Sequence, residues 1–253
     1  MSDITTKAVV YRAPGMDQVK IRRDVESTID LYYPPNAKDE QRLPAVVIVA
    51  GYSDFREPAY FNCKFKEMGW VDSWARLIAI SGMVAVTYST REPVADLRAL
   101  LDFLRLKPGT PGIDGDRIGL FAGSGNVPNA LAALMDGGIK AAAFCNGYTL
   151  DCDPSTVVAD AARTYGFVNP AAGRAVEDLP KNVPLLLVRA GQDQFAGLNG
   201  AMDRFIANAL ASNLPITVIN HASGPHAFDL FDETETSRRI IRQVLAFLIA
   251  NVG

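Results

Sequence analysis

Short runs of consecutive apolar residues recur along the chain, and most are followed by a stretch with helical spacing. The strands of a parallel sheet are covered by helices on both faces, so they read as continuous apolar segments. Strands and helices that alternate in this way predict an α/β fold with a mostly parallel, doubly wound sheet. The apolar runs occupy residues 45–50, 83–88, 118–121, 141–145, 184–188 and 216–219.

Apolar residues at helical spacing predict helices that cover this sheet. One stripe begins next to Pro93, and a proline in the first turn favours the start of a helix. Another stripe lies near the end of the chain. The two stripes consist of Val94, Leu97, Leu101 and Leu104, and of Ile240, Ile241, Val244, Leu245 and Leu248.

The first part of the chain contains two extended segments with no helix predicted between them. They cover residues 7–12 and 25–33, and the second alternates through Ile29, Leu31 and Tyr33. Alternation with a period of two is typical of a strand with one exposed face. We expect these segments to form an antiparallel edge of the sheet.

Residues 151–181 are the other exception. This segment is longer than an ordinary connection between elements, and it contains short helical patches and Pro154, Pro170 and Pro180. Long connections in compact domains often carry function. We expect a single domain over residues 1–253, with this segment as a small lid.

Composition and charge narrow the class of protein. The chain has 253 residues, of which 49% are hydrophobic, and a formal net charge of −3. A charge this small argues against nucleic acid or an anionic membrane as the main partner. Its three cysteines lack C-x-x-C spacing and indicate neither a disulfide framework nor a metal site. Without a signal-like start or an apolar run of about 18 residues, we expect a cytoplasmic protein that needs no cofactor, whose oligomeric state stays open.

The turn after residues 118–121 is the strongest candidate for chemistry. It contains Gly123, Ser124 and Gly125, and a helical pattern follows it. A serine hydroxyl is a poor nucleophile unless a base activates it, and it needs an exposed position on a sharp strand-to-helix turn, which small residues permit. Ser124 is therefore a candidate nucleophile. The alternative is a glycine-rich connection with an incidental serine.

The turn departs from the G-x-S-x-G pattern at both ends. Ala122 stands at the first glycine position and Asn126 at the last. Alanine is the smallest change. Asn126 brings a polar side chain to the place where the new helix packs closest to the sheet, and asparagine accommodates such sites through unusual backbone angles and local hydrogen bonds.

Candidate partners for Ser124 follow later strands. Asp193 comes after the strand at 184–188, and the loop after the last strand carries both histidines, His221 and His226. The order Ser, Asp, His along the chain is the order found in one group of serine hydrolases. His221 lies directly at a strand end, where a structural histidine is common, so His226 is the favoured base.

These segments together resemble the α/β-hydrolase superfamily, and within it the esterase and dienelactone-hydrolase-like branch. The likeness implies that Ser124 is the nucleophile, Asp193 the orienting acid and His226 the base. Asp151 is a rival acid, because some members place theirs after the strand that precedes it. Dienelactone hydrolases use a cysteine at this turn, so the serine favours ester chemistry. The segments that carry the likeness are 28–34, 116–126, 184–193 and 226–229.

The same resemblance implies where a developing oxyanion would bind. Such a site needs two preorganised donors. One is the main-chain amide of Gly125. The other is assigned to the amide of Tyr52, because Gly51-Tyr52 resembles the loop of cutinase-like polyester hydrolases. We expect a small-molecule carboxylic ester as substrate, while thioester, lactone or amide hydrolysis, acyl transfer and a catalytically silent ligand-binding protein stay open.

Other residues carry weaker signals. Cys145 ends an apolar run and is expected as a buried small residue. Arg56, Glu57 and Arg91 lie near the predicted site, where Arg91 is a candidate for binding a substrate carboxylate; solvated loop charges are the simpler interpretation. Core packing is the expected role of both tryptophans.

Overall fold

A computed structural model describes residues 5–23, 28–38, 40–55, 63–106, 112–152 and 154–253. Within these residues the strands are β1 (Lys20–Arg23), β2 (Ile29–Tyr33), β3 (Leu43–Ile48), β4 (Val84–Tyr88), β5 (Ile113–Gly123), β6 (Ala141–Cys145), β7 (Leu185–Gln192) and β8 (Ile216–Pro225). They form one sheet in the order β1-β2-β4-β3-β5-β6-β7-β8. β1, β2 and β4 pair in antiparallel fashion and the other neighbours pair in parallel, which confirms the predicted sheet with its antiparallel edge.

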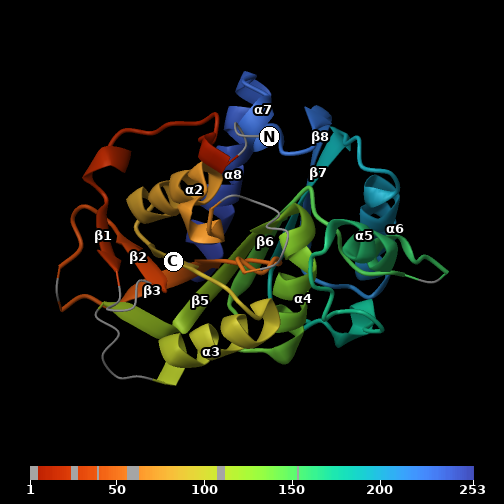
Figure 1. The fold of residues 1–253 in the computed structure, drawn as a ribbon, viewed down its shortest axis with the longest axis horizontal. Helices are drawn as coiled ribbons and strands as arrows, with labels where there is room; N and C mark the ends of the chain where they lie inside the picture. The colour runs from red at the N-terminus through yellow and green to blue at the C-terminus, as the bar shows by residue number, and fades with distance from the viewer. Residues whose placement is uncertain (1–4, 24–27, 39, 56–62, 107–111, 153) are drawn as a thin grey trace.

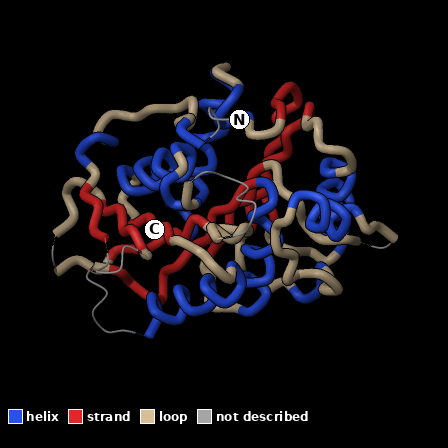
Figure 2. Tube along the Cα trace, viewed as in Figure 1, coloured by secondary structure: helices blue, strands red, loops and turns tan. Residues whose placement is uncertain are grey.

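Helices cover both faces of this sheet. They are α2 (Gly69–Ile80), α3 (Pro93–Leu106), α4 (Val127–Asp136), α5 (Val157–Tyr165), α6 (Leu198–Ala211), α7 (Phe228–Phe231) and α8 (Glu235–Val252). Figure 1 shows α2 and α8 on one side of the sheet and α3 and α4 on the other. Figure 2 shows the strands crossing the centre between the two layers of helices. Among the described residues, no helix is long and apolar enough to cross a membrane.

The stripes predicted from helical spacing face the core. Ile241, Val244 and Leu248 of α8 are fully buried. The helix starts at a capped end, because the Thr234 hydroxyl accepts the Ser237 amide at 3.3 Å, which satisfies one of the amides that a helix start leaves unpaired. Val94, the first member of the α3 stripe, is the exception and is partly exposed.

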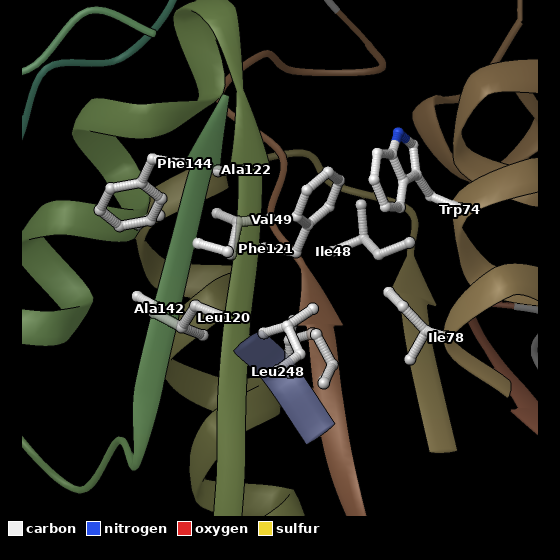
Figure 3. Packing of buried hydrophobic residues seen from close by; sticks show 14 of the residues in the cluster. Ile48, Val49, Trp74, Ile78, Leu120, Phe121, Ala122, Ala142, Phe144 and Leu248 are labelled. Carbon is white, nitrogen blue, oxygen red and sulfur yellow. The ribbon is translucent and has the colours of Figure 1, made fainter. Parts of the chain in front are cut away.

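The central strands are packed from both sides. The Phe121 ring of β5 lies against the Trp74 indole of α2, with ring centroids 4.3 Å apart. Figure 3 shows this contact together with Ile48 and Ile78 on the same side, while Phe144 lies on the other side of the strands. Interiors packed this closely resist displacement, so the carboxyl end of β5 is a firm place for a functional turn.

The N-terminal edge differs from the prediction. Residues 7–12 form no strand, and the outermost strand is β1 instead. The predicted segment is bound by other groups: the Val9 amide donates to Ser73 Oγ at 3.2 Å, and the Val10 amide donates to the Asp229 carbonyl at 2.8 Å. β1 itself reads Lys-Ile-Arg-Arg and is largely exposed, so it carries no hydrophobic pattern that would reveal it.

β7 and β8 extend beyond their apolar cores. Residues 220–225, expected as part of a loop, belong to β8 and continue its pairing with β7 as far as the contact between Gln192 and Pro225. Asp193 and His226 each follow directly on the end of a paired strand. Their main chains are therefore held by the sheet and not by a long loop.

Candidate active site

Ser124 stands at the tip of a sharp turn between β5 and α4. Its φ is 55°, a left-handed value that is uncommon for residues other than glycine. Gly123 before it is extended, and residues Ser124–Asn126 form one 3-10 turn before α4 begins. Strained main chain of this kind is typical of functional turns, and here it separates the serine side chain from the strand.

A serine, a histidine and an aspartate meet where three strands end. Ser124 Oγ lies 2.9 Å from His226 Nε2, and His226 Nδ1 lies 2.6 Å from Asp193 Oδ2. These residues follow β5, β8 and β7. The contacts use opposite ring nitrogens, so an imidazole that keeps its proton on Nδ1, towards the carboxylate, can accept a proton from the serine on Nε2.

Neighbouring groups orient the acid and the imidazole. The Asp193 side chain is fully buried, and its Oδ1 accepts the Phe195 amide at 2.9 Å. The His226 amide donates to Gln194 Oε1 at 3.3 Å. The Phe195 ring meets the His226 ring edge-on at a centroid distance of 4.5 Å. Three neighbours thus fix the imidazole: Gln194 binds the main chain of His226, and the Asp193 carboxylate and the Phe195 ring contact the imidazole itself.

Asn126 joins the serine turn to the connection after β3. Its Oδ1 accepts the Gly51 amide at 2.7 Å, and its Nδ2 donates to the Gly123 carbonyl at 2.9 Å. One turn later, Asn129 Nδ2 donates to the Ala50 carbonyl at 2.8 Å. The asparagine that breaks the glycine pattern therefore takes part in local hydrogen bonding, as predicted, but its backbone is ordinary helical with φ −84° and ψ −18°, so the expected unusual angles are absent. The sequence did not reveal that its partner lies on β3's connection.

The connection after β3 packs closely against the serine turn, and the contact at Gly51 is with main chain, which leaves no room for a side chain there. A Cβ at Gly51 would collide with the Gly125 carbonyl, and a Cβ at Gly125 would collide with the Tyr52 hydroxyl. The Gly51 carbonyl accepts the Val168 amide at 2.8 Å. Tyr52 and Gly125, the two residues predicted to supply oxyanion donors, are consequently close neighbours.

The rival acid and base have other partners. Asp151 accepts the amides of Val158 and Ala159, each at 2.8 Å, in the first turn of α5. It satisfies the unpaired amides of that helix start. His221 is buried, and its Nε2 lies 2.9 Å from Asp232 Oδ2. Both side chains are thus engaged away from Ser124.

A cavity of about 290 Å³ opens beside the Ser124–His226 pair. Most of its wall is apolar or aromatic, as in sites that bind small organic molecules. Tyr165 of α5, within the segment predicted as a lid, belongs to this wall, and so do Tyr52 and Trp70.

The sequence assigns no role to the one carboxylate that lines this cavity in the described residues, that of Asp229. Asp229 belongs to the cavity wall and is 2% exposed. Its Oδ2 accepts from Trp70 Nε1 at 2.6 Å and from Trp74 Nε1 at 2.8 Å. Burial raises the pKa of Asp229, while the two indole hydrogen bonds act to lower it. Both tryptophans are core residues, as predicted, but they also hold this carboxylate. The only signal in the sequence was Asp229's position three residues after His226.

The weaker candidates have different outcomes. Cys145 is buried as expected, and burial raises the pKa of its thiol well above the usual range, so the thiol stays protonated. The Arg91 guanidinium lies over the Phe55 ring at 4.3 Å. Arg56 and Glu57 lie outside the described residues. In the part of the chain that is described, no group of three His, Cys, Asp or Glu side chains is arranged to hold a metal ion.

Comparison with known proteins gives a likeness in structure alone. No protein-family model and no curated protein matches the chain. A thermostable esterase from Pseudomonas putida ECU1011 superposes with a TM-score of 0.69 at 13% identity, over 94% of this chain and 85% of that one. A hyperthermophilic esterase from the archaeon Pyrobaculum calidifontis gives 0.65 at 16% identity, over 92% and 84%. A bacterial heroin esterase gives 0.69 at 13% identity, over 96% and 87%. The chain therefore has the α/β-hydrolase fold, which it shares with these esterases.

Proposed function

We propose that the protein is a serine hydrolase that cleaves a small carboxylic ester through an acyl-enzyme. The observation that carries this proposal is the hydrogen-bonded line from Ser124 Oγ through both nitrogens of His226 to Asp193 Oδ2, with contacts of 2.9 and 2.6 Å. The line lies beside a mostly apolar cavity, and the fold is that of known esterases. Position in the fold and side-chain geometry support the same residues independently.

In the first half-reaction, His226 Nε2 takes the Ser124 proton as Oγ attacks the ester carbonyl carbon. The resulting imidazolium then gives this proton to the oxygen of the leaving alcohol. In the second half-reaction, His226 takes a proton from the water that attacks the acyl-enzyme and returns it to Ser124 Oγ as the acyl bond breaks and the acid product leaves. Asp193 keeps the Nδ1 proton in place and stabilises the imidazolium in both halves.

The oxyanion that forms at the carbonyl oxygen would accept from the main-chain amides of Gly125 and Tyr52. Removal of one such donor from a hydrolase typically costs about 10²- to 10³-fold in rate. Asn126 supports the pair, because its Oδ1 accepts the Gly51 amide at 2.7 Å, directly before Tyr52. Residues 151–181 would act as a small lid, with the Val168 amide bound to the Gly51 carbonyl at 2.8 Å.

The test is to treat the purified protein with a fluorophosphonate probe and to locate the adduct by peptide mass spectrometry. We expect one adduct, on Ser124, that is absent after heat denaturation and in Ser124→Ala. Ser237→Ala serves as the matched control and should label like the wild type. An intact protein with no adduct, or with an adduct on another serine, would contradict the mechanism.

The probe does not depend on the acyl group, so it is followed by a panel of esters, thioesters, lactones and amides. We expect esters of small acids to be hydrolysed fastest. A lactone preferred over every open ester would favour the dienelactone-hydrolase-like branch. Labelling without turnover of any member would favour a ligand-binding protein with an activated serine.

A further inference from the structure

The Asp229 carboxylate is the one ionisable group of the described cavity wall, apart from thiol and phenol groups, that the proposed reaction does not use. It lies in the first turn after His226, on α7. Trp70 and Trp74 both donate to the same oxygen, Oδ2. A carboxylate has about four acceptor sites on its two oxygens, so Oδ1 keeps acceptor capacity after both indoles are bound.

This carboxylate and Ser124 line the same cavity. A Cβ at Gly123 would lie 3.3 Å from Cζ2 of Trp70, whose indole N–H binds Asp229. Gly123 is the neighbour of Ser124 in the chain. The Trp70 indole thus borders the serine turn and also binds Asp229, so an ester bound at Ser124 shares one cavity with the carboxylate.

Among the described residues, the cavity wall holds no permanent cation to balance the charge of Asp229. Within the described residues its wall contains no Lys or Arg, and His226 is the only basic side chain. Arg91, the candidate for binding a substrate carboxylate, is stacked on Phe55 and is not part of this wall. Burial raises the pKa of Asp229, while the two indole hydrogen bonds and the charge of a protonated His226 act to lower it. A cationic ligand would supply the missing countercharge.

Aromatic rings surround the same space. Their faces carry partial negative charge and attract ammonium groups, most strongly when both are shielded from water. Apolar walls alone would accept any small acyl or alkyl group, but rings combined with a buried carboxylate favour a positive one. The aromatic residues of the wall are Tyr52, Phe65, Trp70, Tyr148, Tyr165 and Phe195, together with Phe231.

We propose that the cavity selects esters that carry an alkylammonium group, which binds between the Asp229 carboxylate and the surrounding aromatic rings. This inference rests on the proposed esterase function for its kinetic consequence, but not for the binding itself. Anionic esters would be rejected, because the cavity would place two negative charges together without a cation.

The kinetic test compares esters that have the same shape and differ in charge. For the alcohol side the pair is acetylcholine and 3,3-dimethylbutyl acetate. For the acyl side it is the 4-nitrophenyl esters of 4-(trimethylammonio)butanoate and 5,5-dimethylhexanoate. In at least one of the two pairs, we expect kcat/KM to be at least about ten-fold higher for the cationic ester. A tenfold ratio corresponds to about 1.4 kcal/mol. Ratios near one on both sides would overturn the proposal.

Asp229→Asn tests whether the carboxylate causes the preference. The amide keeps the shape and one acceptor oxygen but loses the charge, so the ratio should fall to near one whatever happens to the overall rate. The matched control is Trp74→Phe, which removes one indole donor to Asp229 outside the cavity wall and retains the charge. This control should keep the ratio. A preference that survives Asp229→Asn would assign it to the rings alone and overturn the role of Asp229.

A binding measurement separates this inference from the proposed function. Calorimetry with Ser124→Ala, which cannot form an acyl-enzyme, compares choline with 3,3-dimethyl-1-butanol. We expect choline to bind at least about ten-fold more tightly. A protein that hydrolyses no ester but binds choline in this way contradicts the esterase and supports the inference. A protein that hydrolyses neutral esters and binds both ligands equally supports the esterase and contradicts the inference.

Discussion

Two histidines of this chain each lie within hydrogen-bond distance of a serine and an aspartate, yet the two clusters differ in every property that matters for catalysis. At His226, Ser124 and Asp193 contact opposite ring nitrogens beside a cavity. At His221, Ser237 Oγ and Asp232 Oδ2 both contact Nε2, at 2.8 and 2.9 Å. The arrangement of partners around the ring, and not their identity, separates the two.

The surroundings of the two rings differ as well. His221 is 1% exposed, and within the described chain no group bonds to its Nδ1. Gly224 packs directly on its ring, and Phe228 meets it edge-on at 5.3 Å. Ser237 is fully buried in the first turn of α8. Substrate cannot reach this buried serine. The cluster instead links β8 to the start of α8, and this holds the end of the strand that His226 follows.

The largest expected difference comes from the two serines. Ser124→Ala should lower kcat by about 10⁴- to 10⁶-fold, because the proposed nucleophile is lost while the fold is kept. Ser237→Ala should lower the free energy of unfolding and leave kcat within a few-fold of the wild type. Steady-state kinetics on a 4-nitrophenyl ester, with denaturant unfolding of both variants, tests the pair. Equal losses of rate would remove the distinction between the clusters.

Substitutions of the two histidines should likewise differ, with one lowering kcat and the other lowering the free energy of unfolding. His226→Gln should lower kcat by about 10⁴-fold or more, because Nε2 no longer accepts the serine proton. His221→Gln should lower the free energy of unfolding by about 1–3 kcal/mol, because buried partners lose a hydrogen bond. Circular dichroism in urea and initial rates measure both. A folded His221→Gln protein with the rate of His226→Gln would contradict this division.

A smaller effect is expected at Asn126. Asn126→Ala breaks the contact with the Gly51 amide, which is 2.7 Å long. Displacement of the proposed oxyanion donor Tyr52 should lower kcat by about 10- to 100-fold with little change in KM, since misplacement by 1 Å can cost a hundredfold. Asn126→Asp keeps an acceptor for Gly51 and should lose less. If the two variants have the same kcat, the asparagine does not act through Gly51.

The smallest effect concerns pH at the structural cluster. Burial alone would raise the pKa of Asp232, but hydrogen bonds from Ser237, Thr234 and His221 outweigh it, so the pKa lies below its usual value. A lowered pKa contributes stability above the usual carboxyl pKa, and that contribution is lost as the pH falls through the folded-state pKa. Asp232→Asn should therefore lower the free energy of unfolding by about 1 kcal/mol at neutral pH. The difference from the wild type should shrink in acid; a difference that grows in acid would contradict this.

Much of the fold could be predicted from the apolar runs, because strands that are buried on both faces must be apolar throughout. The same rule explains why two strand segments were not predicted. β1 has only one apolar side chain, and residues 220–225 are polar or small, so neither has the composition of a buried strand. Residues 7–12 were wrongly assigned to a strand, because an apolar extended stretch packs equally well against helices.

For the site, local sequence revealed the candidate residues but not the contacts between them. Ser124 and its turn were visible because a sharp strand-to-helix turn requires small residues at fixed spacing. Positions after predicted strands made Asp193 and His226 candidates, the resemblance to hydrolases implied their roles, and those roles remain a proposal. Nothing local indicated that Asn126 bonds Gly51, 75 positions earlier in the chain, or that the Trp70 indole bonds Asp229, 159 positions away. Such partners are set by how layers of the fold pack.

The sequence by itself determined the alternation of strands and helices, the strained serine turn and the order of the candidate side chains, since each depends on a residue's own size, polarity or backbone freedom. Tertiary structure decided which histidine faces Ser124, what occupies each of its ring nitrogens and which carboxylate lines the cavity beside them. The reason is physical: catalytic geometry depends on distances of about 3 Å between segments far apart in the chain, and only packing fixes those distances.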